Sequence, residues 1–113
     1  MVPRFLKCSL AVLAISLSVI SAAHAGCEPI SCYKEQITTL YISDHVFLRT
    51  SGDESLLNCA LQSGVYITLR TEHKHFEAIY AFLLSAYHQR EAVTVRIVEG
   101  SSGCEVHHVR DDR

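Results

Sequence analysis

Alternating apolar and polar residues dominate the chain from residue 36 onward and predict a β-rich domain. The runs at 36–42 and 46–50 are dense in β-branched and aromatic residues, and the polar turn Ser43-Asp44-His45 separates them. This arrangement predicts two strands that form a hairpin. Residues 65–70 alternate in the same way and predict a third strand. On it we expect Val65, Ile67 and Leu69 to face inward, and Tyr66, Thr68 and Arg70 to face outward.

A helical period replaces the alternation between residues 76 and 87. Apolar side chains recur there at spacings of three and four, which predicts an amphipathic helix. They are Phe76, Ile79, Tyr80, Leu83, Leu84 and Tyr87. We expect the helix over residues 73–89, with Thr71 capping its start. Phe82 lies off this stripe, so we expect either the N-terminal cysteine loop or a neighbouring subunit of an oligomer to cover it.

Two more strands are predicted after the helix, at residues 93–98 and 104–109, with a turn at 100–103 between them. Residues 56–61 are expected to be extended, and the tail at 110–113 to be loose. The resulting order is β-β-β-α-β-β, a mostly β fold with one helix (α+β). It is the chain order of the OB-fold, a five-stranded, partly open barrel. An open α+β sheet with the helix across one face is the alternative.

The first 25 residues have the pattern of a targeting segment. Two basic residues, Arg4 and Lys7, precede an apolar run, and Ala23-His24-Ala25 then offers a cleavage site. This pattern predicts a cleaved signal peptide over residues 1–25. The apolar run is shorter than the roughly 20 residues that a bilayer-spanning helix needs, so we expect no membrane span.

Cleavage would leave a single OB-like domain over residues 26–113, in a secreted or periplasmic protein. Four of the five cysteines lie in this domain, and an even count in a small exported chain predicts disulfide bonds. Four cysteines allow three pairings. The spacing favours Cys27–Cys32, within an N-terminal cysteine loop at 26–35, together with Cys59–Cys104, which closes a long loop.

Charge and residue types argue against two classes of function. The chain has ten Lys and Arg against twelve Asp and Glu, and removal of residues 1–25 leaves a formal charge of −4. We therefore expect no nucleic-acid partner. The sequence contains no Gly-flanked Ser elbow and no Gly-rich phosphate loop, and its paired acidic residues fall in loops and in the tail. We expect no enzymatic activity and no cofactor.

Histidines are frequent and raise the question of a metal site. His73 and His75 straddle the predicted helix start, where they could meet a distal histidine such as His108. His107 and His108 are adjacent on a predicted strand, where neighbouring side chains point to opposite faces, so we do not expect them to chelate together. Exposed or helix-capping histidines are the alternative interpretation.

Arginine and tyrosine residues on the predicted outward strand positions suggest a ligand-binding surface. An arginine can hold a carboxylate through two hydrogen bonds, and a tyrosine offers both a stacking face and a hydroxyl. Ordinary solvated strand positions are the alternative. The candidate ligand-binding residues are Arg49, Tyr66, Arg70 and Arg96.

Several segments between residues 37 and 104 carry a resemblance to a known family. The segments are Ile37–Tyr41, Leu57–Ala60, Ser63–Leu69, Phe76–Tyr80 and Val93–Cys104. In them the chain resembles small exported bacterial proteins that are related to the B subunits of subtilase cytotoxin and of pertussis-like toxins. The resemblance implies an OB-type barrel, a bridge between Cys59 and Cys104, and a homo-oligomeric ring of five that binds sialylated or other surface glycans.

One departure from the toxin subunits limits what is carried over. Those subunits have a Ser just before the first strand, in the segment that forms their glycan pocket. Tyr33-Lys34-Glu35 takes that place here, behind the extra Cys27–Cys32 loop, so no binding residue is transferred. We expect an exported, disulfide-bonded binding module for a glycan or cell-surface partner. The alternative is a periplasmic structural or stress-related protein that binds a protein partner, or a metal through its histidines.

Overall fold

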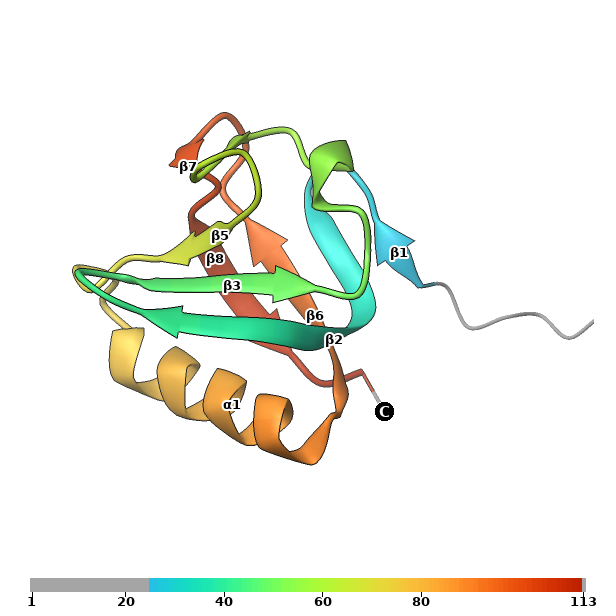
Figure 1. Ribbon diagram of the computed structural model, residues 1–113, viewed down its shortest axis with the longest axis vertical. Coiled ribbons are helices and arrows are strands. Elements are labelled where there is room, and N and C mark those ends of the chain that lie inside the picture. Colours follow the sequence, from blue (N-terminus) through green and yellow to red (C-terminus); the bar gives the residue numbers. More distant parts are fainter. Residues whose placement is uncertain (1–24, 113) are drawn as a thin grey trace, which may run out of the picture.

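Strand β2 (Ser31–Ile42) is the centre of the fold, because both halves of the main sheet pair with it. Its first half pairs antiparallel with β6 (Ala92–Ile97), from Ser31–Arg96 to Gln36–Ala92. Its second half pairs antiparallel with β3 (Val46–Thr50), from Ile37–Thr50 to Ile42–Val46. This second pairing is the predicted hairpin, and Figure 1 shows its two strands running side by side.

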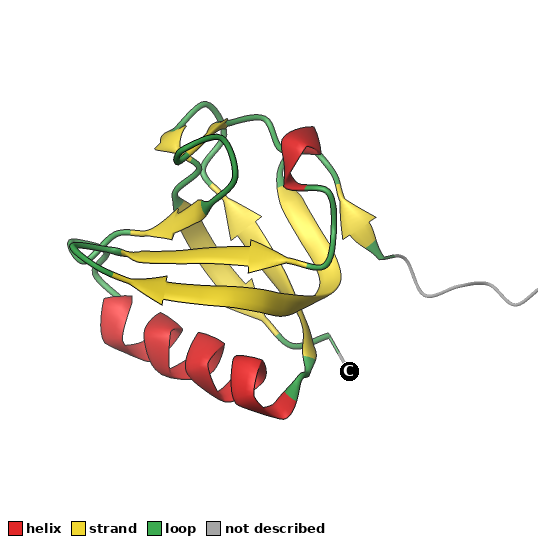
Figure 2. Ribbon diagram, viewed as in Figure 1, coloured by secondary structure: helices red, strands yellow, loops and turns green. Residues whose placement is uncertain are grey.

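The structure, a computed structural model, describes residues 25–112 as mostly β with a single α-helix and one short 3-10 helix, both red in Figure 2. The main sheet has the strand order β5-β3-β2-β6-β8, in which β5 (Ile67–Leu69) and β8 (Val106–Arg110) are the outer strands. The coarse class predicted from the sequence is therefore confirmed. The predicted signal peptide lies outside the described residues, apart from Ala25.

The main sheet does not close into a barrel, although its two outer strands approach each other. The Thr68 N–H donates a hydrogen bond to the Cys104 carbonyl at 3.0 Å, and Thr68 forms an isolated parallel bridge with Glu105. A short parallel ribbon of β4 (Ala60–Leu61) and β7 (Ser102–Gly103) lies next to this junction. Residues 100–103, predicted as a plain turn, thus contribute a strand to this ribbon.

Helix α1 (Phe76–Gln89) begins three residues later than predicted, and Thr71 does not cap it. His75 occupies the N-cap position without a capping side-chain hydrogen bond, while residues 71–75 form turns. Figure 1 shows the helix lying along the sheet. Its buried residues are Ile79, Leu83 and Ala86. Phe82 packs against the core of the same chain, so its coverage does not require a second subunit.

Alternation predicts most of the buried core correctly and fails at one position of β5. Leu48, Ile67 and Leu69 are fully buried, and so are the predicted inward residues Val93 and Val95 of β6. Thr68 was expected to face solvent but is 4% exposed. Its hydroxyl lies under the β4–β7 ribbon, where a Cβ on Gly103 would come within 3.1 Å of Thr68 Oγ1.

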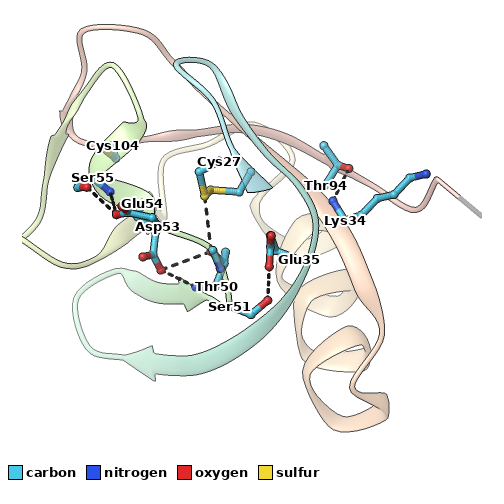
Figure 3. The surroundings of a disulfide bond; sticks show 12 residues. Cys27, Lys34, Glu35, Thr50, Ser51, Asp53, Glu54, Ser55, Thr94 and Cys104 are labelled. Atoms are coloured by element: carbon cyan, nitrogen blue, oxygen red, sulfur yellow. Dashed lines mark hydrogen bonds between the residues drawn. A yellow bond between two sulfur atoms is a disulfide. The ribbon is translucent and has the colours of Figure 1, made fainter. Parts of the chain in front are cut away.

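The N-terminal cysteine segment is more regular than the predicted loop. β1 (Gly26–Cys27) pairs with the start of β2, and Cys27 lies directly opposite Cys32, to which it is disulfide-bonded. Residues 31–35 therefore belong to a strand. Cys27 Sγ lies 3.9 Å from Thr50 Oγ1, at the end of β3 (Figure 3).

A buried carboxylate fixes the loop that follows β3. Glu54, in a 3-10 turn over Glu54–Leu56, accepts hydrogen bonds from the Thr50 N–H at 2.7 Å and from Thr50 Oγ1 at 3.4 Å. Ser51 Oγ donates to the Glu35 carboxylate of β2 (Figure 3). The segment 56–61, predicted as extended, is a strand only at the two residues of β4, because Leu56 ends the 3-10 helix and residues 57–59 are bends.

The C-terminal tail is held against the sheet instead of being loose. Asp112 accepts a hydrogen bond from Thr94 Oγ1 at 2.7 Å and from Arg110 Nε at 2.8 and 3.0 Å. Thr94 is fully buried and its hydroxyl also accepts the Lys34 N–H at 3.3 Å. The Thr94 hydroxyl and the Arg110 guanidinium together lower the pKa of Asp112 below its ordinary value.

The two disulfides should differ in their contributions to stability. Cys59–Cys104 spans 45 residues and Cys27–Cys32 spans five. The chain-entropy relation gives about 4 kcal/mol for the long loop and about 2 kcal/mol for the short one. We expect the variant Cys59→Ala/Cys104→Ala to lose about twice the unfolding free energy lost by Cys27→Ala/Cys32→Ala in urea titrations. Equal losses would contradict this ranking.

The lowered pKa of Asp112 predicts an acid-sensitive contribution to stability. The folded state binds this proton less readily than the unfolded chain, so the contribution is complete above about pH 4 and is lost as the pH falls further. The variant Asp112→Asn should show a weaker decline of the melting temperature between pH 5 and pH 2 than the parent. Superimposable pH profiles would show that the tail does not contribute.

Candidate functional site

Three aromatic side chains gather on the outer face of β2, β3 and the segment before β5. The ring centroids of Tyr41 and Phe47 are 5.6 Å apart and stacked, and Tyr66 lies 6.2 Å from Tyr41 and 6.1 Å from Phe47. We call Tyr41, Phe47 and Tyr66 the aromatic face. Tyr41 is 51% exposed, Phe47 is buried beneath its neighbours, and Tyr66 is half-buried. Tyr41 is thus the ring of the aromatic face that is most open to solvent.

Strand register explains why these rings meet. Tyr41 is the direct antiparallel partner of Phe47, and Phe47 pairs with Thr68 of β5. Alternate residues of a strand share a face, so Tyr66, two residues before Thr68, lies on the same side as Phe47. Arg49 follows Phe47 by two residues on that side and is exposed. Continuing the β3–β5 register by one residue places Arg49 beside Tyr66.

One edge of the aromatic face is polar. His45, in the β2–β3 turn, packs edge-on against Phe47 with ring centroids 6.4 Å apart. The Nδ1 atom of His45 accepts the Thr71 N–H at 3.1 Å and lies 3.8 Å from Glu72 Oε2. The turn between the hairpin strands is thereby tied to the segment that enters the helix.

The structure brings together only part of the predicted ligand-binding set. Arg49 and Tyr66 share the outer face of the sheet, one residue beyond the last β3–β5 pair, Leu48–Ile67. Arg70 forms ion pairs, with Nη1 3.1 Å from Glu105 Oε1 and Nε 3.5 Å from Glu72 Oε2.

Arg96 lies elsewhere, on β6, where it pairs with His108. Its neighbour on β2 is Ser31, eight positions before Thr39, which is the β2 partner of Arg49. Eight residues of strand correspond to roughly 26 Å. Arg49 and Arg96 therefore belong to different surfaces.

Sequence reasoning missed Tyr41 and Phe47. A usable signal was present, because the two residues lie at equal distances from Asp44, the middle of the predicted turn 43–45. In a hairpin, residues equidistant from the turn face each other and their side chains interact. Tyr41 and Phe47 could therefore have been paired from the sequence.

A second cluster involves the histidines of β8. Arg96 pairs with His108, whereas the next residue of β6, Ile97, pairs with Val106, so His107 is an extra residue on β8. This is a β-bulge, which re-aims side chains from their normal alternation. As a result His107 Nδ1 and His108 Nδ1 are 2.8 Å apart. The expectation that these two residues point apart is wrong, because it assumed a regular strand.

The electrostatic surroundings of the His107–His108 pair are positive. Partial burial lowers the pKa of His108 below its ordinary value, and the charges of His107, Arg96 and Arg110 lower this pKa further. His108 is therefore held in its neutral form near neutral pH. At the short Nδ1–Nδ1 separation one ring donates an N–H and the other accepts it.

The predicted metal set His73, His75 and His108 is not assembled as expected. The His73 Nε2 donates to the His107 carbonyl at 3.0 Å, and its Nδ1 accepts the His75 N–H at 3.0 Å. The ring of His75 is 5.9 Å from that of His73. Over residues 25–112 no group of three or more His, Cys, Asp or Glu side chains converges on a common point.

One hollow lies away from both clusters. A shallow cavity of about 510 Å³ opens between β2 and the end of α1. Its lining is Gln36, Ile37, Thr38, Tyr87, His88 and Arg90. None of the three residues of the aromatic face lines this cavity.

Comparisons with known proteins give no relative. No family model matches the chain, and neither a curated protein nor a solved structure matches it at a significant level. In the described part of the chain, no helix is long and apolar enough to cross a membrane.

The buried Thr68 hydroxyl predicts an unusual stabilising substitution. Thr68 Oγ1 has no hydrogen-bond partner among the described residues, and an unpaired buried hydroxyl is unfavourable by about 1–3 kcal/mol. Thr68→Val, which replaces this hydroxyl by a methyl group, should raise the unfolding free energy by about 1 kcal/mol.

Thr94→Val is a matched control, since its hydroxyl has two partners. It should lower the unfolding free energy by about 1 kcal/mol or more in the same urea titration. Destabilisation by both substitutions would contradict the assignment of Thr68 as unpaired.

Proposed function

We propose that this chain is an exported binding module that recognises a glycan on its aromatic face. The observation that carries the proposal is the packing of Tyr41, Phe47 and Tyr66 against one another on the outer strand face, where Tyr41 is 51% exposed and the exposed Arg49 follows Phe47 on the same side. The proposal involves recognition without a chemical step.

The chemistry of this surface suits a sugar. The apolar C–H face of a pyranose ring stacks on exposed aromatic rings, as Tyr41 would allow, and the hydroxyl groups of Tyr41 and Tyr66 can bond to sugar hydroxyls. The Arg49 guanidinium would add bidentate hydrogen bonds to an acidic or vicinal-hydroxyl group. A few polar groups around an apolar platform are the usual composition of a small-ligand site.

We also propose that the fold is an OB-type barrel. The five strands β2, β3, β5, β6 and β8, with α1 between the third and fourth of them, follow the OB order. The link between Thr68 and the start of β8 supports a barrel that is nearly closed. OB-folds bind oligosaccharides on the face of their second and third strands. Here those strands are β3 and β5, which carry or adjoin the aromatic face.

The two disulfides are compatible with an extracellular or periplasmic location, where thiols are oxidised. The ring of five implied by the toxin resemblance is part of the proposal. Several weak sites on one ring would bind a multivalent surface far more tightly than a single site does.

The aromatic face can be tested on a glycan array. Tyr41→Ala and Tyr66→Ala should each weaken binding of the best glycan by about two- to tenfold, because each removes a stacking ring worth roughly 0.5–1.5 kcal/mol. Affinities would be measured by titration calorimetry with that glycan.

Tyr87→Ala is the matched control, because Tyr87 is also exposed but lies on α1. It should bind like the parent. Binding that survives both Tyr41→Ala and Tyr66→Ala would move the site away from the aromatic face. A parent protein with no retention on the array would remove the glycan proposal.

A further inference from the structure

The bulge in β8 creates a pair of metal donors that a regular strand could not provide. His107 is exposed and His108 is half-buried, and their Nδ1 atoms are 2.8 Å apart. Both lie on the same side of the strand because the extra residue interrupts the alternation. We propose that His107 and His108 form a two-nitrogen site for a divalent transition metal ion that favours square-planar coordination, with Cu²⁺ as the best match.

Imidazole nitrogen donors favour Cu²⁺ among the divalent first-row metals, and the preferred coordination geometry separates Cu²⁺ from Zn²⁺. Imidazole nitrogen binds such ions at about 2.0 Å. Two donors at adjacent corners of a square are then separated by about 2.8 Å, whereas two donors of a tetrahedron are separated by about 3.3 Å. In the metal-free pair the 2.8 Å separation is that of an N–H···N hydrogen bond, so the rings must turn before both lone pairs can reach one ion at adjacent corners of a square. Cu²⁺ and Ni²⁺ adopt that geometry with nitrogen donors, while Zn²⁺ prefers the tetrahedron.

Proton balance permits this coordination near neutral pH. In the metal-free pair, one Nδ1–H is shared with the other Nδ1. A bound ion needs both Nδ1 lone pairs, so the shared proton moves to the Nε2 atom of the same ring. Both imidazoles remain neutral, and no further acceptor is needed.

The charged residues around the two histidines determine which ligands fill the remaining coordination positions of the ion. Arg96 and Arg110 act on His108 as positive charges, and they oppose a bare dication. They favour an anionic ligand, such as chloride, hydroxide or a carboxylate, in the positions that the protein leaves to solvent. His73 already donates to the His107 carbonyl, which fixes the backbone of the bulge. The site is therefore open and exchangeable, in contrast to a closed structural metal centre.

This site is separate from the aromatic face. The pair lies on β8 next to β6, whereas Tyr41 and Phe47 lie on β2 and β3, on the other half of the sheet. The metal proposal therefore does not depend on glycan binding, and either can fail alone.

The test is a Cu²⁺ titration of the oxidised protein in a non-coordinating buffer at pH 7.4. We expect one tight Cu²⁺ per chain, with an electron paramagnetic resonance spectrum that shows two equatorial nitrogen donors. His107→Gln and His108→Gln should each weaken this binding by at least about tenfold, because each leaves a single donor. His88→Gln, at the exposed end of α1, is the matched control and should bind like the parent.

A second measurement keeps the proposal testable if a variant folds poorly. In the unmutated protein, substoichiometric Cu²⁺ should first broaden the nuclear magnetic resonance signals of His107, His108 and their neighbours. Broadening spread evenly over all the histidines would overturn the proposal. So would equal losses of affinity in His88→Gln, His107→Gln and His108→Gln, since both results mean adventitious binding to surface imidazoles.

Discussion

The junction at Cys104 holds the fold together, because three different segments meet there. The disulfide ties Cys104 to Cys59, just before the β4–β7 ribbon, and the Cys104 carbonyl accepts the Thr68 N–H of β5. The last strand begins two residues later. A covalent bond and a backbone hydrogen bond on one buried residue therefore bring the two outer strands of the sheet together. Without this junction, β5 would be a three-residue edge strand, which is too short to be stable alone.

Local pattern predicts the elements of this chain well, because most of them follow a single period. The 43–45 turn, the β6 residues Val93 and Val95, and the stripe of α1 all obey alternation or a helical repeat. Both disulfides also join the cysteines that spacing favours. The failures occur where a distant segment intervenes. Thr68 is buried because the β4–β7 ribbon covers it, and the tail is ordered because Thr94 binds Asp112.

The candidate sites were harder to predict than the elements, for a specific physical reason. Alternation predicts that Tyr66 and Arg49 face outward, but the surface they belong to also includes Tyr41 of β2 and Phe47 of β3. The His107–His108 pair depends on a β-bulge in β8. Strict alternation of side chains assumes a regular strand, so it cannot predict such a bulge. Side chains gather where strand pairing brings them together, and pairing offsets of one residue are decided by tertiary contacts.

The length of β2 has a consequence for how the molecule unfolds. Its twelve residues serve as the partner of β6 in their first half and of β3 in their second half. Both halves of the sheet therefore share strand β2. If one half separates, β2 loses a pairing partner that the other half cannot replace. The domain has no internal boundary at which it could be cut into two independently folding pieces, and its amides should lose protection from hydrogen exchange in one cooperative unit.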